Sequence, residues 1–155
     1  MEGEVILRPL NLSDTDLVVS WRNTEAVRLK MYDQSILTVA QHRHYISEFV
    51  EKGIIIQYII VSCETPVGTI FCRYKDKANA EMGIFIAPEH QKKGYGTNAI
   101  NKFVELLRGT TSIIAIGLKV HKTNINAIKL YRKCGFIKTK DKVPAGFISM
   151  SLTIG

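Results

Sequence analysis

The sequence predicts an α+β protein of three layers (αβα), in which a mixed sheet carries helices on both faces. Residues 54–87 read as strands separated by short polar turns, and apolar residues with helical spacing lie on either side, within 38–53 and 97–107. The expected order is β, α, α, then βββ, αβ, αβ, β, which describes a layered sheet. At 155 residues and 46% hydrophobic, the chain has the size of one domain, 1–155.

The first half is expected to hold one strand, short helices and a meander of three strands. Ser13 followed by Asp16 is typical of a helix start, and residues 24–30 continue helically after a break. Thr38 with Gln41 predicts a capping box before a helix that Gly53 ends. The expected strands are Val5–Leu10, Ile54–Ser62, Val67–Tyr74 and Ala80–Ala87.

The second half is expected to alternate helices and strands. Thr97–Leu107 has one apolar stripe at helical spacing, and Gly109 is expected to end that helix. Asn124 can cap a further helix that ends at Gly135. The expected strands of this half are Ser112–Val120, Phe136–Lys140 and Phe147–Leu152.

The segment Gln91-Lys92-Lys93-Gly94-Tyr95-Gly96 stands between a strand and a helix start. Its glycines allow successive backbone N–H groups to point into one concavity, and the helix adds its free amides and positive dipole end. The spacing fits neither G-x-G-x-x-G nor G-x-x-x-x-G-K-[ST], so a Rossmann or P-loop interpretation is not supported. The sequence therefore predicts an anion site of another kind, with a phosphate as its ligand.

The composition of the chain limits the classes of ligand and partner that we expect. Lys and Arg number 21 against 14 Asp and Glu, a net charge of +7, which favours anionic ligands. The basic residues are spread along the chain, so nucleic acid is not expected as the partner. The three cysteines lack metal-binding or redox spacing, and the histidines at 42 and 44 fall on different helix faces, so no metal is expected. With no apolar stretch near ~18 residues and no leader pattern, we expect a cytoplasmic protein without membrane contact.

Two linked motifs resemble the GCN5-related N-acetyltransferase (GNAT) family. Its Q/R-x-x-G-x-G/A pattern is matched by Gln91, Gly94 and Gly96, and its N-x-x-A-x-x-x-Y pattern by Asn124, Ala127 and Tyr131. Residues 8–10 resemble the RimJ/RimL branch of that family. The resemblance implies a GNAT-like, mainly antiparallel sheet and an enzyme that transfers acetyl from acetyl-CoA directly to a primary amine, without a metal.

The resemblance also implies roles for individual residues. The pyrophosphate of the cofactor would lie on amides of the glycine loop. Its pantetheine arm would pair like an added strand with the backbone near residues 85–87, so that the fourth and fifth strands splay apart. Tyr131 would be the general acid toward the departing thiolate, and Glu81 the base. The implied cofactor-binding residues are Phe85, Ile86, Ala87, Gln91, Lys92, Lys93, Gly94, Tyr95, Gly96, Thr97, Asn124, Ala127 and Tyr131.

Within the family, the N-terminal half is similar to PseH-type enzymes, which acetylate a UDP-linked 4-amino sugar. The likeness rests on Trp21-Arg22-Asn23, Met31-Tyr32, Ile36, His42 and Tyr45-Ile46. It implies a sugar nucleotide as the amine acceptor and a monomer or homodimer. The implied acceptor-binding residues are Arg22, Met31, Tyr32, His42, Arg73 and His121.

Other interpretations stay open from the sequence. The acceptor could be a protein N-terminus or another small amine, as the RimJ/RimL branch implies, or the chain could be a non-catalytic module that binds CoA or associates with RNA. Tyr131 could be a core residue with a satisfied hydroxyl, and Glu81 a solvated strand residue. His42 and His121 are as well explained by packing as by substrate contact.

Overall fold

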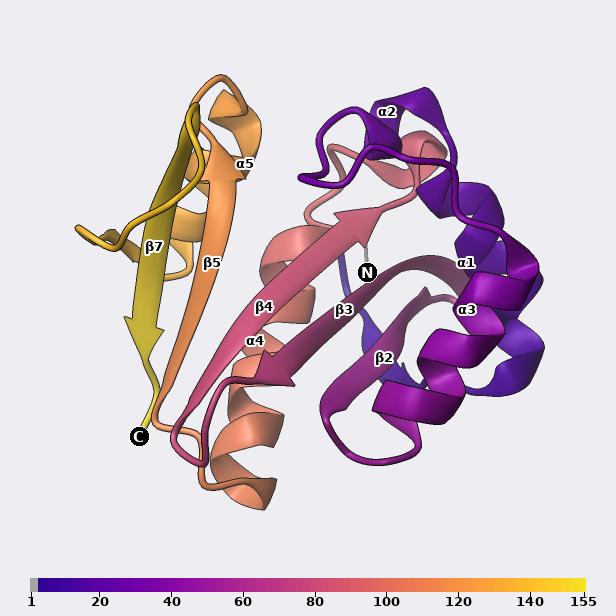
Figure 1. Ribbon diagram of the computed structural model, residues 1–155, viewed down its shortest axis with the longest axis horizontal. Coiled ribbons are helices and arrows are strands. Elements are labelled where there is room, and N and C mark those ends of the chain that lie inside the picture. The colour runs from indigo at the N-terminus through magenta and orange to yellow at the C-terminus, as the bar shows by residue number, and fades with distance from the viewer. Residues whose placement is uncertain (1–2) are drawn as a thin grey trace.

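The computed structural model describes residues 3–155, whose strands form one sheet in the order β1-β2-β3-β4-β5-β7-β6 (Figure 1). The strands are β1 Ile6–Pro9, β2 Ile55–Ser62, β3 Thr65–Tyr74, β4 Asn79–Ile86, β5 Ala115–His121, β6 Ile137–Lys138 and β7 Phe147–Thr153. Neighbours are antiparallel except β4 and β5, which are parallel because a crossover helix separates them in the chain. The predicted mixed, mainly antiparallel sheet is confirmed.

The helices lie before β2 and around β5. They are α1 Thr15–Arg22, α2 Glu25–Arg28, α3 Val39–Tyr45, α4 Tyr95–Thr110 and α5 Ile125–Lys133, with 3-10 turns η1 Leu12–Asp14 and η3 Pro88–His90. The capping box of Thr38 and Gln41 is present at the start of α3, as predicted. A π-helical turn, η2 Ile46–Val50, continues α3.

Two apolar cores, one on each face of the sheet, make the three layers. On one face, Ile100, Phe103 and Leu107 of α4 are fully buried against the strands, and α5 joins them. On the other, Trp21 of α1 and Ile46 of η2 pack in one cluster with Ile59 and Val61 of β2. Burying each such side chain contributes roughly 1.5–3 kcal/mol, so each stripe fixes its helix on the sheet. The predicted helices on both faces are confirmed (Figure 1).

Several boundaries differ from the sequence prediction. The first helical turn is capped by Asn11 with Asp14, not by Ser13, because the Asn11 side chain accepts from the Ser13 amide. The α4 helix begins at Tyr95, two residues early, and runs through Gly109 to Thr110. A glycine favours a helix end where the backbone takes positive φ, and Gly109 is not among the residues described with positive φ. The strand predicted at 136–140 has only two residues, Ile137–Lys138.

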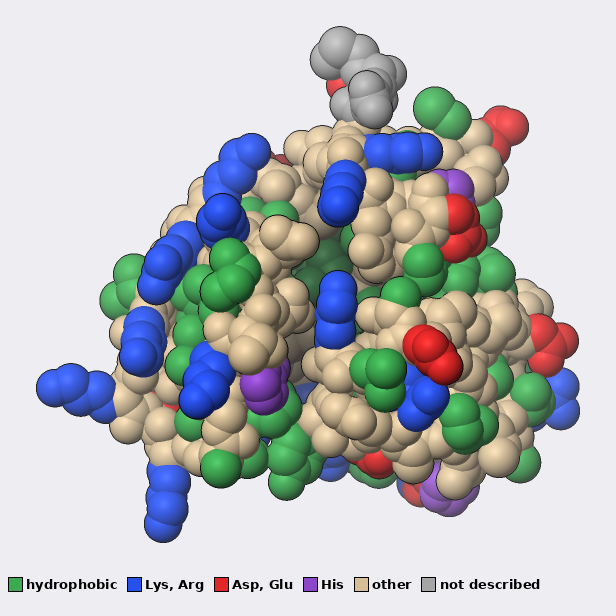
Figure 2. Space-filling model, turned by 90° about the horizontal axis from the view of Figure 1, so that it is seen from above, with side chains coloured by type: hydrophobic (Ala, Val, Ile, Leu, Met, Phe, Trp, Pro, Cys, Tyr) green, Lys and Arg blue, Asp and Glu red, His purple; other side chains and the backbone are tan. Residues whose placement is uncertain are grey.

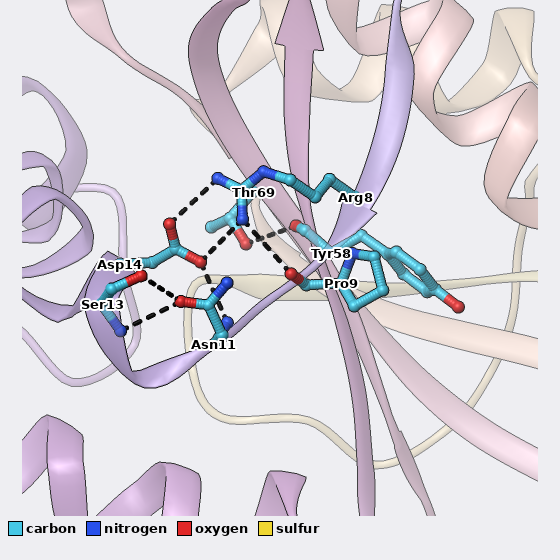
Figure 3. Close-up of polar contacts among 7 residues, drawn as sticks. All are labelled: Arg8, Pro9, Asn11, Ser13, Asp14, Tyr58 and Thr69. Carbon is cyan, nitrogen blue, oxygen red and sulfur yellow. Dashed lines mark hydrogen bonds and ion pairs between the residues drawn. The ribbon is translucent and has the colours of Figure 1, made fainter.

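A polar brace anchors the first helices to the sheet (Figure 3). The Arg8 guanidinium of β1 donates to both oxygens of Asp14, at 3.0 and 2.9 Å, and the Asn11 amide donates to the same carboxylate at 2.9 Å. Burial acts to raise the pKa of Asp14, but these hydrogen bonds outweigh it and hold the pKa below its ordinary value. Ionised Asp14 therefore fixes where α1 starts, and with it the helical layer beside the site.

Candidate active site

The sheet opens into a V at its centre. Pairing between β4 and β5 stops at Glu81 and Gly117, although β4 continues to Ile86 and β5 to His121 (Figure 1). Residues 83–86 are half-buried although β4 is a central strand. The unpaired edge of β4, which leads to Phe85, Ile86 and Ala87, thus faces an opening in which an extended ligand could pair as an added strand, although the Ala87 amide itself donates to the Val67 carbonyl of β3 at 2.8 Å. The expected splay of these strands is present.

The glycine loop follows the end of β4, at the open part of this V. Gly94 has a φ of 82° and Lys92 a φ of 64°, and no side chain among residues 3–155 caps the α4 helix that follows. Such a left-handed turn before free helix amides makes a concave anion site. The Gln91 side chain donates to the Ile86 carbonyl at 3.0 Å and ties the loop to β4. The backbone from Gln91 to Thr97 is therefore a candidate anion site.

Gly96 has a packing role that the sequence did not predict. It lies in the first turn of α4, where an added Cβ would meet Leu130 Cδ2 at 3.0 Å. The missing side chain lets α5 approach α4 closely rather than bending the loop. Asn124 caps α5 by accepting from the Ala127 amide at 3.4 Å. These contacts fix the position of α5, which carries Tyr131.

Tyr131 projects from α5 into the core cluster behind the V. Its ring lies 5.8 Å from the ring of Phe136, and burial raises the pKa of Tyr131 to about 12. The phenol is therefore protonated across the physiological pH range and can act only as a proton donor there. This state is the one that a general acid needs before the reaction.

Glu81 lies where the two strands separate, and it is not simply solvated. Its carboxylate is 3.2 Å from Lys119 Nζ and 3.9 Å from Lys75 Nζ. Glu81 is therefore held in ion pairs with two lysines. Beside it is a cavity of about 380 Å³ whose lining includes Lys75, Glu81, Gly117, Lys119, Ser149 and Ser151. Sequence reasoning missed both lysines, although strand alternation places residue 119 on the face of residue 117.

The segment between α2 and α3, residues 29–38, is held by side chains of the preceding helices; we call it the lid. Arg22 donates to the Asp33 carbonyl, and Arg28 donates to the Gln34 carbonyl at 3.0 Å. Arg22 Nη1 and Arg28 Nε are buried without a partner among the described residues. Burial lowers the pKa of Arg22; nearby Asp33 raises it and Arg28 lowers it further. Arg28 was not singled out from the sequence.

The lid reaches the far side of the V through aromatic rings. Tyr32 is 71% exposed, and its ring lies 5.7 Å from that of Phe147 at the start of β7. Phe147 in turn lies 5.2 Å from His121. The structure thus brings Tyr32 and His121 together around Phe147, while Arg73 lies elsewhere, 4.9 Å above the ring of Phe49 and opposite Glu81 on the neighbouring strand. Met31, the residue before Tyr32, is half-buried.

His42 does not face the acceptor, which corrects the implied contact. It is 3% exposed, and its Nδ1 lies 3.1 Å from Thr15 Oγ1. Its ring stacks on Tyr45 at 5.7 Å, and burial lowers its pKa although Asp14 acts in the opposite direction. Its place in the apolar stripe with Tyr45 explains this burial. His42 is a packing residue between α1 and α3.

Figure 2 looks onto the open end of the V and shows a hollow between its two sides. The side formed by β5, β7 and α5 shows mainly Lys and Arg among its charged side chains. Within residues 3–155, no group of three or more His, Cys, Asp or Glu side chains could hold a metal ion. The same described chain contains no helix long and apolar enough to cross a membrane.

Comparison with known proteins gives a consistent class. The model of the acetyltransferase (GNAT) domain family matches residues 4–137. Spermidine N(1)-acetyltransferase of Vibrio cholerae is 24% identical over 153 residues, covering 96% of this chain and 88% of the relative. The chain belongs to the GNAT acetyltransferase family. It is an N-acetyltransferase that uses acetyl-CoA, as the V, the glycine loop and the buried phenol suggest.

Solved structures agree in fold at low identity. Spermidine N-acetyltransferase from Vibrio cholerae, in complex with CoA and spermine, has a TM-score of 0.86 at 19% identity, covering 97% of this chain and 95% of the other. The aminoglycoside acetyltransferase AAC(6')-Ib, in complex with coenzyme A, has a TM-score of 0.83 at 21% identity with the same coverage. One related structure of the Vibrio cholerae enzyme is described as dodecameric. Neither the RimJ/RimL branch nor the PseH type is identified by these matches.

Proposed function

We propose that this N-acetyltransferase acts on a primary amine carried by an anionic molecule, a UDP-linked 4-amino sugar. The main observation is the pair of arginines that hold the lid, Arg22 and Arg28, each with a buried N–H that lacks a partner among residues 3–155. Guanidinium groups bind phosphate oxygens well because their donors form a planar fork. Two such guanidinium groups favour a diphosphate over a polycation.

The charge of the whole chain supports the same acceptor class. Spermine and aminoglycosides, the acceptors of the related structures, carry several amines, whereas this chain has a net charge of +7. Repulsion between like charges disfavours a polycation near Arg22, Arg28 and Lys119. Lys119 also contacts Glu81 at 3.2 Å, which reduces the negative charge available to an ammonium group.

The chemistry divides among a few residues. Acetyl-CoA, when bound, supplies an acetyl thioester. The backbone from Gln91 to Thr97 would hold its pyrophosphate, and the strand end at 85–87 its pantetheine arm. Glu81 would take the proton that the attacking amine loses, directly or through water, and Tyr131 would give its proton to the departing thiolate sulfur.

The rates of acetyl transfer to different amine acceptors test the proposal. Release of free thiol would be measured with acetyl-CoA and a panel of UDP-amino sugars, spermidine, an aminoglycoside and peptides with free N-termini. We expect a UDP-amino sugar to rank first. Preference for spermidine would contradict the anionic acceptor, and preference for peptides would support the protein N-terminus instead.

Substitution of Arg28 tests whether the arginines that hold the lid bind the acceptor. Arg28→Met should raise the KM for the sugar nucleotide about tenfold or more, because it removes a hydrogen bond to a charged group. Arg43→Met is the matched control, since Arg43 is an exposed arginine on α3. Equal effects of the two substitutions would show that general charge, not the lid site, attracts the acceptor.

A further inference from the structure

His121 lies at the end of β5, on the face of the sheet that carries Glu81. Lys119, two residues earlier, contacts Glu81 at 3.2 Å, and side chains two apart on a strand share a face. His121 pairs with Phe147 across β5 and β7, and the ring of Tyr32 from the lid lies against Phe147 at 5.7 Å. The imidazole therefore stands where the lid meets the open end of the V.

A backbone contact decides which ring nitrogen carries the proton. The amide N–H of Thr123 donates to His121 Nδ1 at 3.2 Å, and Thr123 Oγ1 lies 2.7 Å from the same nitrogen. An amide N–H can only donate, so Nδ1 accepts and the proton of the neutral ring resides on Nε2. His121 consequently offers a hydrogen-bond donor at Nε2 and is not free to act there as a base.

A glycine keeps this donor open. Gly146, just before β7, has a φ of 87°, and an added Cβ would lie 2.9 Å from His121 Nε2. The Gly146 carbonyl accepts from the Lys122 amide at 2.9 Å, which fixes the turn beside the imidazole. Any other residue would suffer backbone strain and cover the nitrogen. The turn thus leaves a directed N–H uncovered at the mouth of the site.

We propose that His121 is a specificity-determining residue whose Nε2–H donates a hydrogen bond to an oxygen of the amine acceptor. Thr123 is its positioning residue, and Gly146 keeps the nitrogen accessible. The inference rests on the proposed function in one respect: a sugar nucleotide offers such oxygens on its diphosphate and its base. Polyamines such as spermine have none, so this donor favours an oxygen-rich acceptor over a polyamine.

Steady-state kinetics with two variants of His121 test the donor. His121→Leu should raise the KM for the acceptor about tenfold and leave the KM for acetyl-CoA and the kcat near the wild type. His121→Gln retains an N–H near the same place and should recover most of the loss. An unchanged acceptor KM in His121→Leu, or an equal rise in the KM for acetyl-CoA, would overturn the proposal.

Glycine variants test access to Nε2. Gly146→Ala should raise the acceptor KM as His121→Leu does. Gly53→Ala is its matched control, because Gly53 also has positive φ, 74°, but no described atom within 4 Å of an added Cβ. Equal KM values for Gly146→Ala and wild type, at equal melting temperatures, would contradict the role of Gly146.

The tautomer can be measured without any acceptor. Nitrogen NMR shifts of the imidazole should show Nε2 protonated and Nδ1 unprotonated in the neutral ring, and protonated Nδ1 would overturn the proposal. The two proposals can fail separately. If the wild type prefers an aminoglycoside or a peptide, both of which carry oxygens, the sugar-nucleotide function fails, but His121→Leu should still raise the KM for that acceptor. If His121→Leu leaves the KM of the preferred acceptor unchanged, or if spermidine is preferred, the role of His121 fails as well.

Discussion

Replacing Tyr131 with Phe removes one oxygen atom and leaves the aromatic ring against Phe136, 5.8 Å away. If the phenol is the general acid, kcat should fall about 10²–10⁴-fold, the range for a positioned acid or base. That loss equals roughly 2.7–5.4 kcal/mol in the activation free energy. The dissociation constant for CoA should stay within about twofold, because the helix amides and β4 backbone that hold it are unchanged.

The assay combines free-thiol release, which measures kcat, with calorimetric titration of CoA. Tyr58→Phe is the matched control, since Tyr58 packs beside the same core cluster, 6.1 Å from Phe103 and outside the V. Because burial raises the pKa of Tyr131 to about 12, wild-type kcat should show no decline from this group below about pH 11. Retention of wild-type kcat by Tyr131→Phe would refute the assignment.

Three further predictions concern packing and pH. Gly96→Ala should destabilise the protein by about 1–3 kcal/mol and weaken CoA binding, because the added Cβ would meet Leu130 at 3.0 Å. Its control, Gly109→Ala in the same helix, should stabilise the protein by roughly 0.5–1 kcal/mol; urea unfolding and CoA titration of both variants test this. Burial lowers the pKa of His42 below 6.5, so on acidification the unfolded chain binds a proton before the folded one does, and the free energy of unfolding should fall as the pH drops below about 6.5. His42→Gln should weaken this pH dependence, and urea midpoints that stay unchanged from pH 8 to 5 in the wild type would contradict it. Asp14→Asn should cost about 2 kcal/mol in urea unfolding at pH 7, because it weakens charged hydrogen bonds; loss below about 0.5 kcal/mol would show that the brace is dispensable.

Local sequence signals predicted much of the fold. The capping box at Thr38 and the apolar stripe of α4 were found correctly because each depends on contacts within a few residues. Gly109 was misread because composition alone does not reveal φ, and its helix continues one residue further. The order and alternation of elements sufficed for the three layers.

The candidate site was less accessible to sequence reasoning. The loop at Gly94 carries its own signal, but the ion pairs of Glu81 depend on the β4–β5 register, which joins residues far apart in the chain. Arg28 was missed because its significance lies in a buried N–H without a partner among the residues that the structure describes, a property of the folded chain and not of its sequence. His42 shows another limit: from the sequence, packing and substrate contact explained it equally well, and only its burial in the fold, 3% exposed, decided for packing.

The V also has a mechanical consequence. In the described sheet, the part made by β1–β4 is joined to the part made by β5, β7 and β6 by only three paired residues on each strand, from Asn79–Ala115 to Glu81–Gly117. A ligand strand that paired with β4 and β5 beyond this junction would add backbone contacts between the two parts of the sheet. Amide hydrogens at the end of β4 should therefore exchange with solvent faster in the empty protein than in the loaded one, so the enzyme stiffens as it fills.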